Sequence, residues 1–470
     1  MVMNCKSIIP RRPLVSLSKL MLIVFMSLLL SISSCNTSAL KDQKPFSVEH
    51  PDWVYPATIY EVNVRQFTPQ GTFEAFASHL PRLKELGVDI LWFMPIHPIG
   101  EKNRKGTLGS YYSVKDFKAV NPEFGTLDDF KKVVSEAHKL GMKVIIDWVA
   151  NHSSHDNVWT TTNPDFYIRD SVGNLVSQYD WSDVAKLDYQ NPELRKAMID
   201  AMKFWLTETN IDGFRCDVAF LVPTDFWNQA RKELQKVKPV FMLAEAEHID
   251  LLEYAFNAEY GWKLHHIMNN IAQEKLTATA LDGYFLDTLA TYPKQAIKMN
   301  FTSNHDENSW NGTEFERLGD GAKTFAAFTF TIPGMPLIYN GQEVGFNHRL
   351  EFFEKDQINW NDNGEFEKFY KTLTVLRKRN SALWVADKGA DMERILTPES
   401  PTAYVFVRRN DKDKVLAIFN FGKNLAEINL NHELIAGKYN DIFSNTEIEF
   451  SANETLKLNP WEFRILEAVK

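Results

Sequence analysis

The sequence predicts an α/β fold: a (β/α)8 TIM barrel with a small insert after its third strand and a C-terminal antiparallel β-sandwich domain. Three observations predict it. Between residues 57 and 383, amphipathic helical segments alternate with short apolar segments, with Gly or Asn at the junctions. Residues 150–186 are polar and aromatic and lack a long helical pattern. After Trp384 the apolar residues recur at every second position, which is typical of antiparallel strands with one exposed face.

The first 34 residues have the pattern of a targeting segment. They carry Lys and Arg but no acidic residue, and residues 20–30 form an apolar run that is too short to cross a bilayer as a helix. The following residues 32–35 (ISSC) resemble a bacterial lipobox, in which Cys35 would be lipidated. We therefore expect a lipoprotein signal peptide over residues 1–34 and a tether over 35–52. The alternative is a plain secretory peptide in which the Cys is incidental.

These features imply secretion across the inner membrane. Lipid chains on Cys35 would then anchor the protein to the membrane of the bacterial envelope, at its periplasmic or its cell-surface face. The sequence does not decide between the two faces.

The barrel is expected over residues 53–390. Apolar residues at helical spacing predict helices over 73–83, 127–137 and 194–205, and Gly87 and Gly141 end the first two. A glycine at a helix end followed by a continuously apolar strand is typical of a parallel sheet covered on both faces. The predicted strands lie near residues 57–64, 89–95, 143–148, 213–218, 241–245, 254–258, 299–304 and 336–340.

Two segments depart from the helix–strand pattern. Residues 150–186 follow the third predicted strand and are expected to form an irregular insert. In residues 395–470, apolar side chains such as Ala426, Ile428 and Leu430 alternate with polar ones, which predicts the antiparallel β domain.

The composition excludes several function classes. With 470 residues, 44% of them hydrophobic and 24% charged, the chain has the composition of a globular protein. Its net charge of −9 repels phosphate backbones, so nucleic acid is not an expected partner. The three cysteines provide neither a disulfide framework nor a CxxC metal motif. The oligomeric state is not determined by the sequence.

Polar residues follow four of the predicted strands, and in a barrel the carboxyl ends of the strands meet at one mouth. They are Asp147, Asn151 and His152, Arg215 and Asp217, Glu245, and His305 and Asp306. A single strand-end Asp is usually a helix cap, and a His beside an Asp is usually a loop pair. The convergence of carboxylates, histidines and an arginine at one mouth indicates a catalytic site instead.

Four of these segments resemble the signature segments of the α-amylase family of glycoside hydrolases (family thirteen). They are residues 147–152 (DWVANH), 213–217 (GFRCD), 242–245 (MLAE) and 301–306 (FTSNHD), and they occur in the order typical of that family. The resemblance extends over nearly the whole chain from residue 55. It implies a (β/α)8 barrel, an insert after strand three and a C-terminal β-sandwich, the same architecture that the hydrophobic pattern predicts.

The resemblance implies a role for each carboxylate. Asp217 corresponds to the nucleophile, Glu245 to the general acid/base, and Asp306 to the carboxylate that holds the 2- and 3-hydroxyls of the sugar. Retaining glycosidases need two carboxyl groups about 5–5.5 Å apart. Arg215 lies two residues before Asp217 and projects to the same side of the strand, so we expect it to keep Asp217 ionised. We expect burial to keep Glu245 protonated.

The resemblance also implies contacts to the sugar in subsite −1. His152 and His305 correspond to hydrogen-bonding residues, and Tyr112 to a stacking platform, although a merely buried aromatic is the alternative for Tyr112. Strand alternation directs Cys216 away from the mouth, so we expect it to be a core residue.

Two departures from the family pattern concern substrate and metal binding. Phe220 and Leu221 stand where many members have Lys-His, and residues 184–188 (VAKLD) stand where many have LPDLD. Asn151 matches one ligand of the usual calcium site, but Lys186 replaces an aspartate. We therefore expect no metal cofactor, with the Lys186 ammonium bonded to the Asn151 side-chain oxygen in place of the cation. The alternative is an exposed Lys186 and calcium held by other oxygens.

The expected function is retaining hydrolysis of α-glucosidic bonds, α-1,4 above all, in starch, maltodextrin or maltooligosaccharides. An α-glucanotransferase or an α-1,6-acting, pullulan-degrading enzyme would use the same carboxylates. A non-catalytic glycan-binding lipoprotein is the alternative from another class, but binding alone would not require both an acid and a nucleophile. Endo or exo action does not follow from the sequence.

Overall fold

The structure is a computed structural model that describes residues 48–361 and 364–470. The predicted signal peptide, Cys35 and most of the predicted tether lie outside these residues. Among the helices described, none is long and apolar enough to span a membrane.

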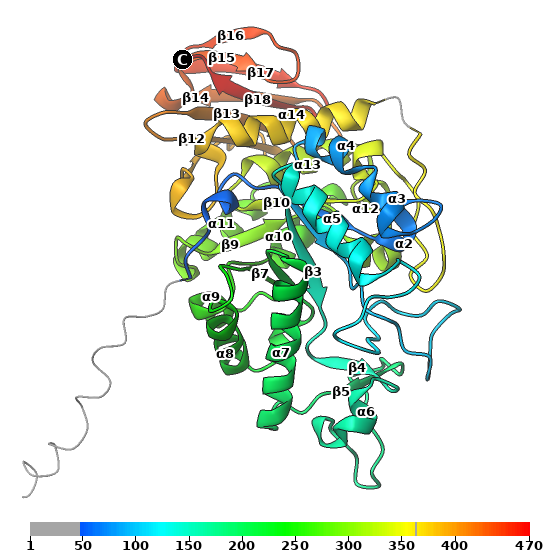
Figure 1. Cartoon of the computed structure of the whole chain (residues 1–470). Helices are drawn as coiled ribbons and strands as arrows, with labels where there is room; N and C mark the ends of the chain where they lie inside the picture. Colours follow the sequence, from blue (N-terminus) through cyan, green and yellow to red (C-terminus); the bar gives the residue numbers. More distant parts are fainter. Residues whose placement is uncertain (1–47, 362–363) are drawn as a thin grey trace, which may run out of the picture. The chain divides into compact units, whose positions relative to one another are not determined.

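Eight parallel strands form a closed barrel in the order β1-β10-β9-β8-β7-β6-β3-β2, which confirms the predicted fold class. Figure 1 labels β3, β7, β9 and β10 of this barrel. The strands are β1 (Ile59–Val62), β2 (Ile90–Phe93), β3 (Lys143–Trp148), β6 (Gly213–Cys216), β7 (Phe241–Ala244), β8 (Ala258–Tyr260), β9 (Ile297–Asn300) and β10 (Met335–Tyr339). Gly213 allows close pairing of β6 with β7, because a Cβ there would lie 1.8 Å from the Phe241 carbonyl oxygen.

Helices surround the barrel, and their ends follow the expected signals. Gly87 ends its helix in the left-handed conformation at φ 96°, and Thr126 begins another through a capping box with Asp129. The helices are α2 (Val64–Phe67), α3 (Phe73–Ala77), α4 (Leu80–Leu86), α5 (Leu127–Lys139), α7 (Pro192–Thr209), α8 (Thr224–Leu234), α9 (Ile249–Tyr254), α10 (Trp262–Ala272), α11 (Ala280–Thr291), α12 (Glu314–Leu318), α13 (Ala322–Thr331) and α14 (Glu365–Arg379).

Two predicted strands are displaced. The sixth was expected at 254–258, but Tyr254 ends helix α9 and the strand β8 covers Ala258–Tyr260. A short apolar run looks the same at a buried helix end and in a strand, so periodicity did not separate them. The seventh was expected at 299–304, but β9 ends at Asn300. Residues 301–304 leave the barrel because Thr302 bonds to side chains of a neighbouring helix instead of a strand.

Side chains along each strand alternate between the barrel interior and the layer of helices. On β3, Ile145 belongs to the interior cluster while Val144 and Ile146 pack in the cluster that includes the helices. The same alternation on β6 places Phe214 and Cys216 outside. Asp147 and Arg215 therefore face the interior from the carboxyl ends of their strands.

The insert and the C-terminal domain have the expected character. In the insert, β4 (His152–Ser154) pairs with β5 (Val184–Lys186), and the short helix α6 (Trp159–Thr162) lies between them in sequence. The C-terminal domain has a six-stranded antiparallel sheet of order β11-β12-β13-β18-β15-β16 and a two-stranded sheet, β14-β17, which enclose one apolar cluster. Its strands are β11 (Met392–Ile395), β12 (Ala403–Arg409), β13 (Lys414–Asn420), β14 (Ala426–Asn431), β15 (Gly437–Asp441), β16 (Glu447–Phe450), β17 (Asn453–Leu458) and β18 (Phe463–Ala468).

The C-terminal domain packs on the barrel through a buried arginine. The Arg408 guanidinium donates to the carbonyls of Thr331, Ile332 and Leu383 from the barrel domain. This contact is at the amino ends of β9 and β10, away from the carboxyl ends that carry the candidate catalytic residues.

Candidate active site

A buried arginine organises the floor of the barrel mouth. Arg215 on β6 lies opposite Asp147 on β3, and its Nη1 donates to both carboxylate oxygens at 2.9 and 3.1 Å. Its Nε donates to the hydroxyl of Tyr260 on β8 at 3.0 Å, and its guanidinium carbon lies 5.1 Å from the centre of the Trp92 ring. Both Arg215 and Asp147 are fully buried, so these contacts fix the guanidinium in one position.

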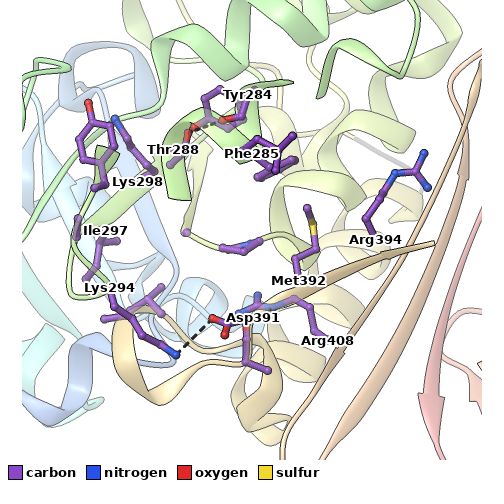
Figure 2. Close-up of a pocket in the computed structure, with 18 of the residues that line it drawn as sticks. Tyr284, Phe285, Thr288, Lys294, Ile297, Lys298, Asp391, Met392, Arg394 and Arg408 are labelled. Carbon is purple, nitrogen blue, oxygen red and sulfur yellow. Dashed lines mark hydrogen bonds and ion pairs between the residues drawn. The ribbon is translucent and has the colours of Figure 1, made fainter. Parts of the chain in front are cut away.

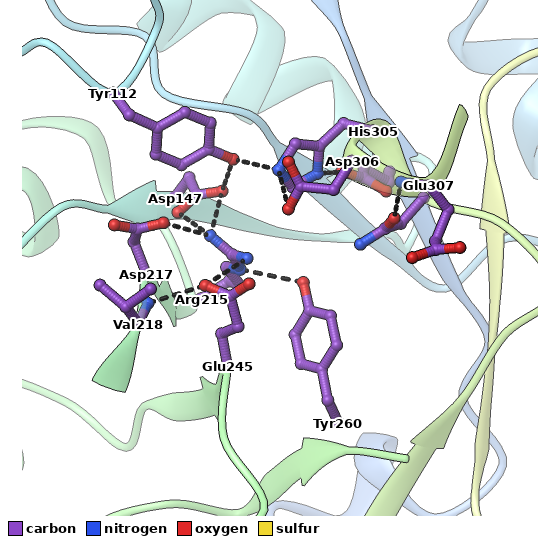
Figure 3. A network of polar contacts seen from close by, with 12 residues as sticks. Tyr112, Asp147, Arg215, Asp217, Val218, Glu245, Tyr260, His305, Asp306 and Glu307 are labelled. Carbon is purple, nitrogen blue, oxygen red and sulfur yellow. Dashed lines mark hydrogen bonds and ion pairs between the residues drawn. The ribbon is translucent and has the colours of Figure 1, made fainter. Parts of the chain in front are cut away.

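The same guanidinium joins Asp217 and Glu245 (Figure 3). Arg215 Nη1 lies 3.3 Å from Asp217 Oδ1, and Nη2 lies 3.0 Å from Glu245 Oε2. The backbone N–H of Val218 also donates to Glu245 Oε2, at 2.7 Å. The two carboxyl groups are therefore neighbours across one cation, and Glu245 Oε1 is the oxygen that remains for a ligand.

Burial raises the pKa of both carboxyl groups. The pKa of Asp217 lies well above its usual range because the group is desolvated and faces Glu245. Burial also raises the pKa of Glu245, although Arg215 opposes this. Arg215 lowers the pKa of Asp217, as a neighbouring cation should, but burial and Glu245 outweigh it. Repulsion between such close carboxylates favours one shared proton, with one group ionised and the other neutral.

His305 is held as a cation beside these carboxylates. Burial lowers the pKa of His305, but Asp306 and Glu61 outweigh it and raise the pKa to about 9. Nδ1 donates to Glu61 Oε1 at 2.5 Å, and Nε2 lies 2.7 Å from the Tyr112 hydroxyl and 3.4 Å from Asp306 Oδ2. The Tyr112 hydroxyl in turn donates to Asp147 Oδ2 at 3.0 Å. This chain of contacts links the loop after β9 to the Arg215 cluster.

His152, in contrast to His305, is neutral. Burial lowers its pKa to about 3, so the ring is neutral at the pH at which most enzymes work. The Asn151 amide lies 3.1 Å from Nδ1, and Nε2 lies 3.9 Å from Asp217 Oδ2. With Nδ1 as acceptor, Nε2 carries the proton and can donate to a ligand hydroxyl.

Most of these residues line one cavity of about 470 Å³. Of the seven predicted catalytic and substrate-binding residues, six line it: Tyr112, His152, Asp217, Glu245, His305 and Asp306. Arg215 lies beneath them. Cys216 faces the helices and is fully buried, as expected of a core residue.

Another cavity, of about 400 Å³, lies between helix α11 and strands β11 and β12 (Figure 2). Its lining includes Phe285, Met392 and Arg408, and an ion pair joins Lys294 to Asp391 at 3.4 Å. None of the predicted site residues lines this cavity. It is separate from the candidate active site.

Sequence reasoning missed two residues that hold the site. Glu61 is a fully buried carboxylate in the apolar strand β1. A single acidic residue within an apolar strand is visible in the sequence and could have marked Glu61 as a site residue. Tyr260 gave no comparable signal, because tyrosine is common in strands and its strand was misplaced. The sequence identified Asp147 only as a polar residue at a strand end, whereas the structure shows that it anchors Arg215.

Asn151 and Lys186, the two residues of the predicted calcium-site replacement, have other contacts in the structure. In the described part of the chain, no group of three or more His, Cys, Asp or Glu side chains could hold a metal. Asp183, the nearest acid before Lys186, forms an ion pair with Lys105 at 3.1 Å. The structure describes both Lys186 and Asn151, and the expected bond between their side chains does not form. Instead, Lys186 pairs with His152 through the backbone.

Residues 53–437 match the family model described as the catalytic domain of alpha amylase. The solved alpha-amylase from Lactobacillus plantarum is 32% identical, with a TM-score of 0.80 over 89% of this chain and 100% of that one. The noncanonic maltogenic alpha-amylase AmyB from Thermotoga neapolitana is 30% identical, with a TM-score of 0.81 over 88% and 99%. A maltogenic alpha-amylase from Bacillus acidopullulyticus is 27% identical over 450 residues, covering 89% of this chain and 74% of that protein.

Proposed function

This chain belongs to the α-amylase family of glycoside hydrolases, and we propose that it hydrolyses α-1,4 bonds of starch-derived glucans with retention of configuration. The observation that carries the proposal is the position of Asp217 and Glu245 on the two terminal nitrogens of one buried guanidinium, in a cavity that Asp306 also lines. As a glycosidase of this family, the protein is an enzyme, so the non-catalytic alternative is set aside.

In the first step, Asp217 attacks the anomeric carbon while Glu245 protonates the oxygen of the leaving sugar. Glu245 Oε2 accepts the Val218 N–H and faces Arg215, so the transferable proton belongs on Oε1. The bond from the anomeric carbon to the glycosidic oxygen breaks as the bond to an Asp217 oxygen forms. Loss of the proton leaves Glu245 as a carboxylate beside Arg215.

In the second step, a water molecule attacks the anomeric carbon from the side that the leaving sugar vacated. Glu245 takes the proton of the water, and the bond to Asp217 breaks. Two displacements on opposite faces retain the configuration, and both carboxyl groups return to their starting protonation.

The other buried charges position these groups. Positive charge develops on the sugar ring in each transition state, and the Asp217 carboxylate faces it. The Arg215–Asp147 pair and the Glu61–His305–Asp306 set hold these side chains before substrate arrives, which lowers the cost of reorganisation during the reaction.

Product analysis tests the proposal. Maltoheptaose, soluble starch and pullulan are each incubated with the enzyme, and the products are separated by chromatography while proton NMR follows the first anomer released. We expect α-anomeric maltooligosaccharides from the first two substrates. Products longer than the substrate would favour the glucanotransferase, which transfers the same glycosyl group to a sugar hydroxyl. Faster cleavage of pullulan would favour the α-1,6-acting alternative, and a β-anomer would disprove retention.

We also propose that Cys35 anchors the enzyme to the bacterial envelope through lipid. The support is the sequence alone: a basic segment, an apolar run of signal-peptide length and the ISSC segment directly after it. Such an anchor would hold the active site at the envelope, where extracytoplasmic glucans arrive.

A further inference from the structure

The rim of the catalytic cavity is closed by linked loops along one arc of the barrel. The rim wall, as we call it, consists of residues 104–110 after β2, residues 181–184 of the insert after β3, and residues 352–354 after β10. With β1 between them, these strands are consecutive in the barrel. The remaining strands, β6 to β9, carry Asp217, Glu245 and Asp306 at or after their carboxyl ends.

Polar contacts join the three segments of the rim wall. Lys105 Nζ lies 3.1 Å from Asp183 Oδ1, which links the loop after β2 to the insert. The Leu108 N–H donates to the Phe353 carbonyl at 3.1 Å. The Thr107 N–H donates to Glu354 Oε1 at 2.8 Å, and the Thr107 hydroxyl donates to Glu354 Oε2.

Further bonds tie the rim wall to the barrel below. Arg65, which follows β1, donates to the Gly109 carbonyl at 3.2 Å, and the Ser113 hydroxyl donates to the Asp183 carbonyl at 2.9 Å. The wall is therefore held by side chains from several elements and not by a single loop.

Aromatic rings cover the inner side of this wall. The Phe352 ring is nearly parallel to that of Tyr112, at 13° and 6.2 Å between centroids, and the Trp310 ring lies 5.1 Å from Phe352. Trp310 is 52% exposed although it follows Asp306 by only four residues. Ring faces of this kind bind the apolar faces of sugars, and Trp310, Phe352 and Phe353 line the cavity, so the wall borders a sugar subsite.

The position of the general acid, Glu245, determines in which direction the glucan chain lies in the cavity. The leaving sugar must lie beside Glu245 on β7, and the retained sugar must lie beside Tyr112, His305 and Asp306. The closed arc is therefore at the end that receives the non-reducing part of the glucan. On the Glu245 side, Phe220 is 47% exposed and stacks on His248 at 9° and 5.9 Å, so that side presents an exposed ring surface to the leaving chain.

We infer that the enzyme is exo-acting: the rim wall admits only the non-reducing end of a glucan, and each cleavage releases a product of one or two glucosyl units. This inference rests on the proposed function and specifies its substrate. The cavity of about 470 Å³ lies in the lower half of the range of small-ligand sites, about 300–1,000 Å³, a size that suits a short glycone.

Two p-nitrophenyl maltoheptaosides test the inference, one free and one blocked by an ethylidene group on the non-reducing glucose. Their cleavage is followed by chromatography, together with that of maltoheptaose labelled at its reducing end. We expect the blocked substrate to be cleaved at least 100-fold more slowly than the free one. The first labelled products should be shorter than the substrate by one or two units.

Comparable rates on both substrates, or a spread of first products of all lengths, would overturn exo action and leave the proposed function intact. Absence of cleavage of every substrate would overturn both. In a Lys105→Ala/Thr107→Ala variant we expect the blocked-to-free rate ratio to rise at least tenfold. The control is Lys423→Ala, which removes an exposed ion pair to Glu274 outside the cavity and should leave the ratio unchanged.

Discussion

Replacement of Glu61 by Gln should lower the pH above which the enzyme loses activity. Glu61 is one of two carboxylates that raise the pKa of His305 to about 9 against the effect of burial. Its Oε1 lies 2.5 Å from Nδ1, whereas Asp306 Oδ2 lies 3.4 Å from Nε2. An opposite charge at such distances raises a pKa by about one to three pH units, so we expect the alkaline limit of kcat/KM to fall by about that amount.

The same charge state makes stability depend on pH. A histidine whose pKa rises from about 6.5 in the unfolded chain to about 9 in the folded one stabilises the fold fully below pH 6.5. This contribution, about 3 kcal/mol for His305, is lost as the pH rises through about 9. In the Glu61→Gln variant it should be smaller and should disappear at lower pH.

The measurements are kcat/KM on maltoheptaose between pH 5 and 10, urea unfolding at pH 6 and 9.5, and the NMR titration of the His305 ring. Asp212→Asn is the matched control, since Asp212 contacts His138 at 2.7 Å near the amino end of β6, away from the cavity. The control should lose stability but keep the alkaline limit. An unchanged limit in Glu61→Gln, with His305 still titrating near 9, would refute the argument.

Three further predictions concern catalysis, anchoring and metal. Asp217→Asn and Glu245→Gln should each lower kcat by at least about a thousandfold, or about 4 kcal/mol, with an unchanged circular dichroism spectrum, and a rate above a tenth of wild type would exclude the assigned role. Cys35→Ala should move the enzyme from the membrane fraction to the soluble one at unchanged specific activity, and an unchanged membrane fraction would disprove the anchor. Dialysis against excess chelator should change neither starch hydrolysis nor Tm. If added calcium restored lost activity or raised Tm by several degrees, the proposed loss of the calcium site at Lys186 would be wrong.

The sequence alone determined the architecture and six of the residues that line the cavity. Helical spacing, the Gly residues at helix ends and the period of two after Trp384 are local patterns, and they predicted the barrel and the antiparallel domain. Strand alternation also placed Arg215 and Asp217 on one side of β6 and Cys216 on the other. Such features depend on residues only a few positions apart, so they can be read along the chain.

Only the tertiary structure decided how these residues share charge and where the cavity ends. Glu61 meets His305 and Tyr260 meets Arg215 because closure of the barrel brings β1, β9, β8 and β6 around one interior. The contact of Arg215 with three carboxylates depends on the same closure, and so does the burial that raises the pKa of Asp217. The rim wall joins loops far apart in sequence through single polar contacts such as Lys105–Asp183. No periodicity encodes a contact of this kind, because it depends on how the loops pack after the strands have paired.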